Sequence, residues 1–545
     1  MSGADRSRPR RWGVRWSAVL LAAVAAGLGA VALRALLDVT THGLLGSVLP
    51  LEPIGAGLWY APVEPLRDRG AWLLPLLVAG GMVTAVLLSR LGGPQVNGTD
   101  GVINAVNGRD LSGLTVRGAL SKLGGTAVTL GSGGSGGTEG PVAQVSASLS
   151  AAVGRRLRLT PGESGLVVVA ALGAGVGALF QAPIGGVLLA GELLRRRGID
   201  WAAMIFALPA VPIAFWIFVA VYGYRPMFGV ADFGALWDPG STALLAAVGL
   251  VCALVARLYV WTFHTVGRLT APMRRWPVVT AAVAGAALGT VGIFLPMTLG
   301  TGYGIVSMGL SQVAVAALPL WLLVALPLVK IAATSVTLHT GGVGGVFGPA
   351  MVIGATTGAL CWRLAFEAGL QPGSAAAFTI TGMAACLGPA VRTPLAAIAL
   401  ALESSGGALP PVGLVVAVAI AAACTRDITL FRSQAERQFP RRYRQLRVSE
   451  WRISAILKAV ASRKRARVSA TIGGIRSRYR ARSGSPGGGC AMEPESARGV
   501  PDLADLPLDE LLSAHRPEVV QAYRTALHRR ASVGIIFAGH NAGGA

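Results

Sequence analysis

Long apolar segments alternate with short polar ones along most of this chain. Several of these uncharged segments approach or exceed the roughly 20 residues that an α-helix needs to cross a bilayer core. The clearest are Trp16–Leu33, Ala71–Leu88, Leu244–Val255, Val278–Thr301 and Val313–Leu328. Because lipid excludes backbone whose polar groups are unpaired, such segments predict helices. The pattern therefore predicts an all-α polytopic membrane protein, with residues 16–435 as one transmembrane domain.

Two glycine-rich segments interrupt the apolar pattern and match each other without a gap. Gly131–Pro141 and His339–Pro349 share four glycines, a fifth before the proline, and the proline itself, at an offset of 208 residues. A second pair follows, because Ala182–Glu192 and Thr393–Glu403 both place a Pro nine residues before a Glu. A duplicated break in apolar segments indicates a transporter built from two repeats, with its substrate site at the breaks. We place these repeats at about residues 70–225 and 275–430.

Each break is predicted to be an extended loop that leads into the N-terminus of a helix. Glycine permits backbone angles that other residues avoid, and Gly-Pro is a natural helix opening. The N–H groups at a helix start carry roughly half a positive charge, which suits an anion that must be bound and then released. Close packing of helices through small residues is the alternative explanation for the glycines.

Glu139 is an ionisable residue inside the first break. Carboxylates within a membrane are costly and usually functional. Beside a helix N-terminus, an ionised Glu139 would occupy the place of a permeating anion, and protonation would release it. We therefore predict that Glu139 is a gate and a proton carrier, with a glutamate on a surface loop as the alternative.

Charged residues gather outside the apolar segments. The chain is 53% hydrophobic and 13% charged, with a formal net charge of +23. Residues 1–15 form a basic arm, and sixteen Lys or Arg against two Glu lie between Arg432 and Arg482. The positive-inside rule places both termini in the cytoplasm of a protein of the cell inner membrane. Residues 436–545 are predicted to be a basic, partly disordered tail whose partners are anionic membrane lipids and not nucleic acid.

One motif indicates a different class of protein. Gly131–Gly136 fits the G-x-G-x-x-G pattern of dinucleotide-binding proteins, and Thr126–Leu130 before it has the composition of a strand. A membrane-embedded nucleotide-binding enzyme is therefore one alternative, and a membrane scaffold without transport is another. The five cysteines have neither disulfide nor metal spacing, so no metal and no cofactor are expected.

At these residues the chain resembles the CLC family of chloride channels and proton-coupled chloride transporters. Thr138–Pro141 with Gln144 is similar to the family's G-[RK]-E-G-P-x-x-Q motif, and Gly345–Pro349 fits its G-x-F-x-P motif. Phe180–Pro183 with Glu192 is similar to its F-N-A-P segment and following Glu. The resemblance implies an inverted-repeat CLC chloride channel fold with broken and re-entrant helices, a homodimer, and one anion path per subunit.

The resemblance also implies a function. The protein is then not an enzyme, and it moves chloride or a similar small anion across the membrane, passively or coupled to protons. A fluoride- or nitrate-selective carrier of the same fold is the alternative. Glu139 corresponds to the family's external gating glutamate, and the backbone amides of Val346 and Phe347 to its central anion site.

Four positions depart from the family pattern, and the first is Thr138, which stands where the motif has Arg or Lys. Asn97 stands at the place of a filter serine, although a shifted alignment puts Thr99 there, and Phe431 replaces a tyrosine that closes the inner side. The loss of these hydroxyl groups leaves anion selectivity open. Leu193 replaces an inner proton-transfer glutamate, which favours a channel, or a transporter with another proton route. The predicted anion-binding residues are Asn97, Gly98, Thr99, Gly137, Gly140, Gly345, Val346, Phe347 and Phe431.

Overall fold

The computed structural model describes residues 7–49, 52–54, 58–60, 70–91, 98–229, 239–407 and 412–435. The chain divides into two compact units, Met1–Leu446 and Arg447–Ala545, and the described residues all belong to the first. The tail predicted for residues 436–545 and the filter position Asn97 lie outside the described residues.

Helices make up nearly all of the described chain, and the predicted all-helical fold is confirmed. The α-helices are α1 (Ser7–Thr40), α2 (Gly70–Leu91), α3 (Gly98–Gly108), α4 (Val116–Gly131), α5 (Glu139–Arg156), α6 (Pro161–Leu179), α7 (Pro183–Glu192), α8 (Trp201–Tyr222), α9 (Pro239–Leu269), α10 (Pro277–Phe294), α11 (Tyr303–Gly309), α12 (Gln312–Ala317), α13 (Leu320–His339), α14 (Phe347–Glu367), α15 (Ala375–Val391), α16 (Pro394–Ser404) and α17 (Val412–Cys424). The shorter elements are the π-helical turn η1 (Thr41–Leu45), the 3₁₀ turns η2 (Ala271–Arg275) and η3 (Pro296–Thr298), and the antiparallel strands β1 (Glu52–Ile54) and β2 (Leu58–Tyr60).

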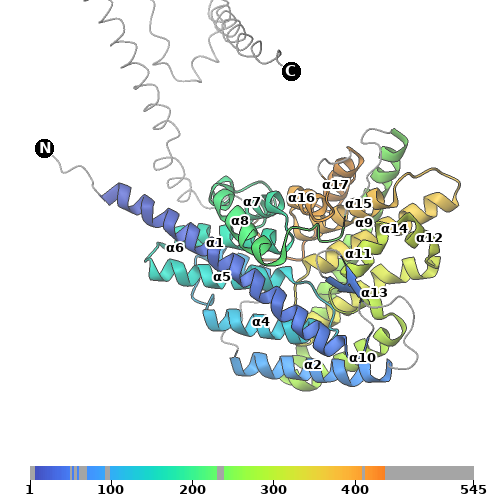
Figure 1. Ribbon diagram of the computed structural model, residues 1–545, viewed down its shortest axis with the longest axis horizontal. Helices are drawn as coiled ribbons and strands as arrows, with labels where there is room; N and C mark the ends of the chain where they lie inside the picture. The colour runs from blue at the N-terminus through green and yellow to red at the C-terminus, as the bar shows by residue number, and fades with distance from the viewer. Residues whose placement is uncertain are drawn as a thin grey trace, which may run out of the picture. The chain divides into compact units, whose positions relative to one another are not determined.

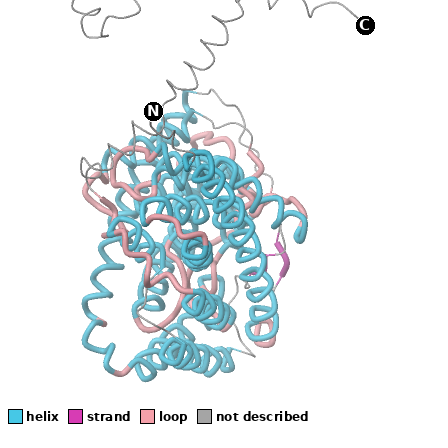
Figure 2. Tube along the Cα trace, turned by 90° about the vertical axis from the view of Figure 1, so that its left-hand side faces the viewer, coloured by secondary structure: helices cyan, strands magenta, loops and turns pink. Residues whose placement is uncertain are grey.

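Seven of the described helices are long and apolar enough to cross a membrane by length and composition. Figure 1 shows the helices of the first half, α4 to α8, beside those of the second half, α9 to α17. The long helix α1 lies across the first half and packs against α5, α6 and α8, while α2 packs against α10. Figure 2 shows loop segments that run between helices in the middle of the bundle, as broken helices require.

The first helix is longer than the apolar run that predicts it. Trp16–Leu33 ends where Arg34 begins a charged turn, but α1 starts at Ser7, within the predicted basic arm, and continues to Thr40. Arg34 and Asp38 stay helical because they pair one turn apart, with 2.9 Å between Arg34 Nε and Asp38 Oδ1. A charge at the end of an apolar run therefore did not mark the end of this helix.

Two other apolar runs are divided in the structure. Val278–Thr301 does not form one span, because α10 ends at Phe294 and Pro296 opens the short turn η3. Val313–Leu328 is split between α12 and α13, with Pro319 at the junction. Proline has no N–H group and clashes with the preceding turn, so it starts a helix more readily than it continues one.

The strand composition of Thr126–Leu130 is misleading, since these residues lie in α4. At membrane depth a lone strand would leave its backbone N–H and C=O groups unpaired, whereas a helix pairs them within itself. The strand–loop–helix context that a dinucleotide-binding motif needs is therefore missing at Gly131–Gly136.

The short helices α7 and α16 carry the second matching motif, and the glutamate of each helix caps the N-terminus of the other. The Glu192 carboxylate at the end of α7 accepts two N–H groups from the first turn of α16, at 3.3 and 2.8 Å. The Glu403 carboxylate near the end of α16 accepts two N–H groups from the first turn of α7, at 3.1 and 2.8 Å. Each carboxylate thus satisfies orphan donors at the positive end of the other helix. The donors are Leu395, Ala396, Ile184 and Gly185.

We expect Glu192→Ala to lower the free energy of unfolding by about 2 kcal/mol, because it leaves buried N–H groups without an acceptor. The measurement is the thermal unfolding midpoint of the purified protein in detergent. Glu367→Ala is the control, because that carboxylate is exposed and pairs only with Arg363 one turn away. Equal midpoints for the two variants would contradict the stabilising role of the exchange.

Candidate functional site

The two glycine-rich breaks meet inside the bundle. The loop between α4 and α5 and the loop between α13 and α14 run antiparallel, and Gly137 and Gly345 exchange two backbone hydrogen bonds of 2.9 and 2.6 Å. The contact allows no side chain, since a Cβ on Gly140 would lie 2.8 Å from the Cα of Gly345. The N-termini of α5 and α14 are thereby brought together.

A second pair of contacts repeats the same symmetry. The Thr337 hydroxyl of α13 accepts the N–H of Ser135 at 3.1 Å, and the Thr129 hydroxyl of α4 accepts the N–H of Val343 at 3.0 Å. Donor and acceptor in each bond are related to those of the other by the offset of 208 residues found in the sequence. The two halves therefore form equivalent contacts in opposite directions, as an inverted repeat requires.

The Glu139 carboxylate lies on the N-terminus of α14. The side chain is fully buried, and Oε2 accepts the N–H of Gly348 in the first turn of α14 at 2.9 Å. Oε1 accepts hydrogen bonds from the Thr138 hydroxyl, at 3.1 Å, and from the Tyr303 hydroxyl. A carboxylate thus occupies the backbone donors that a small anion would need at this helix start.

Val346 and Phe347 open α14 beside this carboxylate. Val346 is the N-cap and has no side-chain cap, and the first N–H groups of a helix have no acceptor within it. The hydroxyl of Tyr259 donates to the Val346 carbonyl at 3.4 Å, which fixes the plane of that peptide. The phenyl ring of Phe347 faces the ring of Phe431, with 5.7 Å between their centroids. The structure therefore brings Gly137, Gly140, Gly345, Val346, Phe347 and Phe431 around Glu139 and its helix pair.

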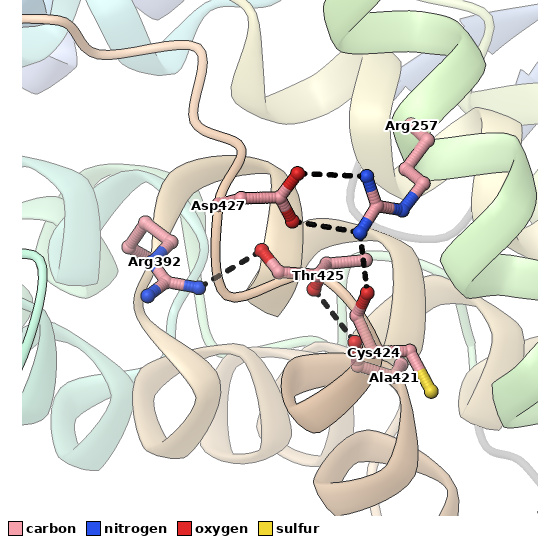
Figure 3. Close-up of polar contacts among 6 residues, drawn as sticks. All are labelled: Arg257, Arg392, Ala421, Cys424, Thr425 and Asp427. Carbon is pink, nitrogen blue, oxygen red and sulfur yellow. Dashed lines mark hydrogen bonds and ion pairs between the residues drawn. The ribbon is translucent and has the colours of Figure 1, made fainter.

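Phe431 is held by the segment that follows α17. Figure 3 shows the start of this segment, where the Arg257 guanidinium donates to both carboxylate oxygens of Asp427, at 2.9 and 2.7 Å, and to the carbonyl of Cys424. Arg392 donates to the carbonyl of Thr425 at 3.0 Å. The hydrogen bonds from Arg257 lower the pKa of the Asp427 carboxyl, which keeps this pair charged. Further along, the Leu430 N–H donates to the carbonyl of Ala390 at 2.8 Å.

The remaining predicted residues lie at the start of α3. The Gly98 N–H donates to the side-chain oxygen of Gln144 on α5 at 3.0 Å, and Thr99 is buried behind it. Gln144 therefore ties the N-terminus of α3 to the helix that carries Glu139. Leu193 is buried, and its carbonyl accepts the Gln434 side-chain amide at 3.0 Å.

Two residues of the site were not predicted from the sequence. Tyr303 donates to Glu139 from a segment 164 residues away. Lys330 is fully buried in α13, and its ammonium group donates to the carbonyls of Thr298 and Gly300 at 3.0 and 2.9 Å. A lysine within an apolar helix is itself a functional signal, and Gly300 and Gly302 before Tyr303 mark a third break. Both signals were present, but neither belongs to the duplicated motif.

Within the described residues, no group of three or more His, Cys, Asp or Glu side chains is placed to hold a metal ion. The described polar groups of the site are instead backbone amides, hydroxyl groups, one carboxylate and one ammonium. This set of groups suits a small anion.

Comparisons with known proteins agree with this geometry. Residues 80–426 match the family model described as voltage gated chloride channel. An uncharacterised protein of Methanocaldococcus jannaschii is 27% identical over 311 residues, which cover 57% of this chain and 75% of that protein. A crystal structure of a CLC-type fluoride/proton antiporter has a TM-score of 0.66 at 19% identity and covers 78% of this chain and 98% of its own. A slow cyanobacterial Cl⁻/H⁺ antiporter has a TM-score of 0.60 at 20% identity, over 75% and 94% of the two chains. The two structures show the shared fold.

We expect Gly345→Ala to destabilise the protein by about 2–4 kcal/mol, because the new Cβ would lie 2.5 Å from the Gly140 nitrogen. Thermal unfolding in detergent measures the effect. Gly108→Ala is the matched control, since a Cβ there meets nothing within 4 Å. If both variants unfold at the wild-type temperature, close approach of the two breaks does not require glycine.

Proposed function

Because the chain belongs to the voltage-gated chloride channel family, we propose that it moves chloride or a similar small anion along a path controlled by Glu139. The family accounts for anion transport across a membrane. The observation that carries the finer proposal is the hydrogen bond from the Gly348 N–H to the Glu139 carboxylate. It places a protein carboxylate on the helix N-terminus that is best suited to bind the anion.

Competition between two negative charges explains the gate. Two unit charges about 4 Å apart repel by about 4 kcal/mol at the effective dielectric constant of a protein, so an ionised Glu139 keeps another anion off the start of α14. Protonation removes that charge. The neutral carboxyl group then moves away from the start of α14, and an anion takes its place. The amides of Val346 and Phe347 then bind the anion through partial charges, which are weak enough to release it.

The Phe347–Phe431 ring pair closes one side of this site and bears on anion selectivity. Neither ring has a hydroxyl donor, so backbone amides must supply the hydrogen bonds to an anion there. This observation keeps fluoride or nitrate as the alternative transported ion. A competition series of chloride, nitrate and fluoride in one flux assay distinguishes them.

Leu193 bears on the coupling to protons. It is buried and apolar, and the side chain that contacts its backbone, Gln434, is an uncharged amide. Position 193 therefore offers no carboxylate that could pass a proton to or from Glu139. This arrangement favours passive anion movement with proton-controlled gating, or a transporter with another proton route, over a standard antiporter.

The surroundings of the protein follow from the same proposal. We place it in the cell inner membrane as a multi-pass protein with both termini in the cytoplasm, in contact with lipid.

Apolar side chains on α7, α8 and α16 are exposed in the single chain, among them Ile184, Leu208 and Leu395. Such a surface fits a second copy of the chain, so we propose a homodimer.

Glu139→Gln tests the gate. In liposomes with a chloride gradient, wild-type flux should rise as the pH falls from about 7.5 to about 4.5, because Glu139 becomes protonated. The variant keeps the shape of the side chain but has no charge, so its flux should be high and nearly independent of pH. Glu163→Gln is the control, because that residue caps α6 and pairs with Arg15 away from the site.

An unchanged pH dependence in Glu139→Gln would refute the gate. A pH indicator in the same liposomes tests passive movement, and uphill proton movement driven by the chloride gradient would overturn it.

Tyr303→Phe tests how the carboxylate is held. Loss of the hydroxyl removes one charge-assisted hydrogen bond, worth about 1.5–3 kcal/mol, so the carboxylate should leave α14 more readily. We expect chloride flux at neutral pH to increase by about tenfold. Tyr224→Phe is the matched control, since Tyr224 is exposed and its ring packs edge-on against Phe215 and not against Glu139. Equal fluxes for the two variants would show that Tyr303 does not hold the gate closed.

A further inference from the structure

A cavity of about 70 Å³ lies next to the Glu139 carboxylate. Two of its lining residues, Thr138 and Tyr303, are the residues whose hydroxyl groups donate to that carboxylate. Another part of the lining comes from α1 and η1, which contribute Arg34, Asp38 and Thr41. The cavity is thus lined by residues that hold Glu139 in place, and neither Phe347 nor Phe431 is among its lining residues. We name it the access cavity.

Arg34 is the one cation among the described residues that line the access cavity, and Asp38 is the one anion. Arg34 is 6% exposed, and its guanidinium carbon lies 5.8 Å from the centre of the Tyr222 ring. Asp38, one turn further along α1, accepts a hydrogen bond from Arg34 Nε at 3.0 Å. The carboxylate therefore fixes the direction of the guanidinium group.

A second cation stands behind the wall formed by Gly300 and Gly302. The Lys330 ammonium group donates to the Gly300 carbonyl. A Cβ on Gly302 would lie 3.0 Å from the Lys330 ammonium nitrogen. Among the described residues in and behind the wall, the cations are Arg34 and Lys330, and the anions are Asp38 and the ionised form of Glu139. Their formal charge is therefore one positive unit when Glu139 is protonated. The residue directly before Glu139 is the uncharged Thr138, so the positive charge of the cavity comes from α1 and α13.

A buried arginine at the end of an apolar membrane helix is costly and needs a reason. An apolar pair at positions 34 and 38 would attach α1 to its neighbours without the cost of removing a guanidinium group from water. The pair instead opens on a cavity whose other polar groups are hydroxyls, next to a carboxylate that an anion must displace. This combination matches the chemistry of a small monovalent anion.

We propose that the access cavity is a waiting site for the transported anion, in which Arg34 draws the anion in and Asp38 limits how tightly it is held. This inference rests on the proposed function. The positive charge raises the local concentration of anions beside Glu139, and the neighbouring carboxylate keeps the site from trapping them. Arg34 is then a positioning residue for the substrate and not part of the gate.

The experiment measures initial chloride flux into liposomes over a series of chloride concentrations, at a pH where the gate is open. Arg34→Gln should raise the chloride concentration for half-maximal flux by about fivefold, with the maximal rate nearly unchanged. Arg34→Lys should restore most of the affinity, because it keeps the charge. Asp38→Asn should lower the half-maximal concentration, because it removes the competing carboxylate.

Screening of charges by salt gives a second test of the waiting site. A purely structural role of Arg34 would not depend on the salt concentration. Addition of an impermeant salt should reduce the difference between wild type and Arg34→Gln, because the attraction is electrostatic. Arg15→Gln is the matched control on the same helix, since Arg15 pairs with Glu163 outside the cavity. Its half-maximal concentration should equal that of the wild type.

An unchanged half-maximal concentration in both Arg34→Gln and Asp38→Asn would overturn the waiting site while leaving the proposed function in place. A wild-type protein that carries no anion would instead overturn the proposed function. If Arg34→Gln does not fold, Asp38→Asn and Arg34→Lys still decide, because a shift in the same direction for both would contradict opposite electrostatic roles.

Discussion

Two broken helices meet at Gly137 and Gly345, and most of the site depends on that meeting. The pair of backbone hydrogen bonds between them satisfies polar groups that lipid could not satisfy, and it does so at a distance that only glycine allows. Because the contact is antiparallel, it points the starts of α5 and α14 toward the same space. A concentration of backbone N–H groups inside a membrane is otherwise hard to achieve, and it supplies positive potential without a full charge.

The Glu139 carboxylate lies in that positive potential, where it accepts the Gly348 N–H. Buried carboxylates are expensive, but this one receives an amide and two hydroxyl donors, so its cost is offset while it stays in place. In the proposed function, an anion takes over the same donors when Glu139 leaves. Under that proposal, the stability of the closed site and its affinity for the transported ion depend on one set of hydrogen bonds.

Charges in the membrane region are placed in relation to this site and its repeat symmetry. Glu192 and Glu403 hold the short helices α7 and α16 together by capping each other's first turn. Lys330 binds the carbonyls of the third break, and Arg34 lines the cavity beside Glu139. Each of these groups has a partner within the fold, which is the condition under which a membrane protein retains ionisable side chains.

The sequence by itself determined the helical class, the duplication and the residues that carry it. The offset of 208 residues between the breaks already pairs Thr129 with Thr337 and Gly137 with Gly345, because a repeat keeps equivalent residues at equal spacing. Only the tertiary structure decided the direction of those pairings and which other residues lie beside them. Tyr303, Lys330 and Arg34 come to the site from segments outside the duplicated motifs, and no local periodicity relates them to Glu139. Their proximity follows from how α1, α11 and α13 cross the broken helices, and such crossings are set by side-chain packing between segments far apart in the chain.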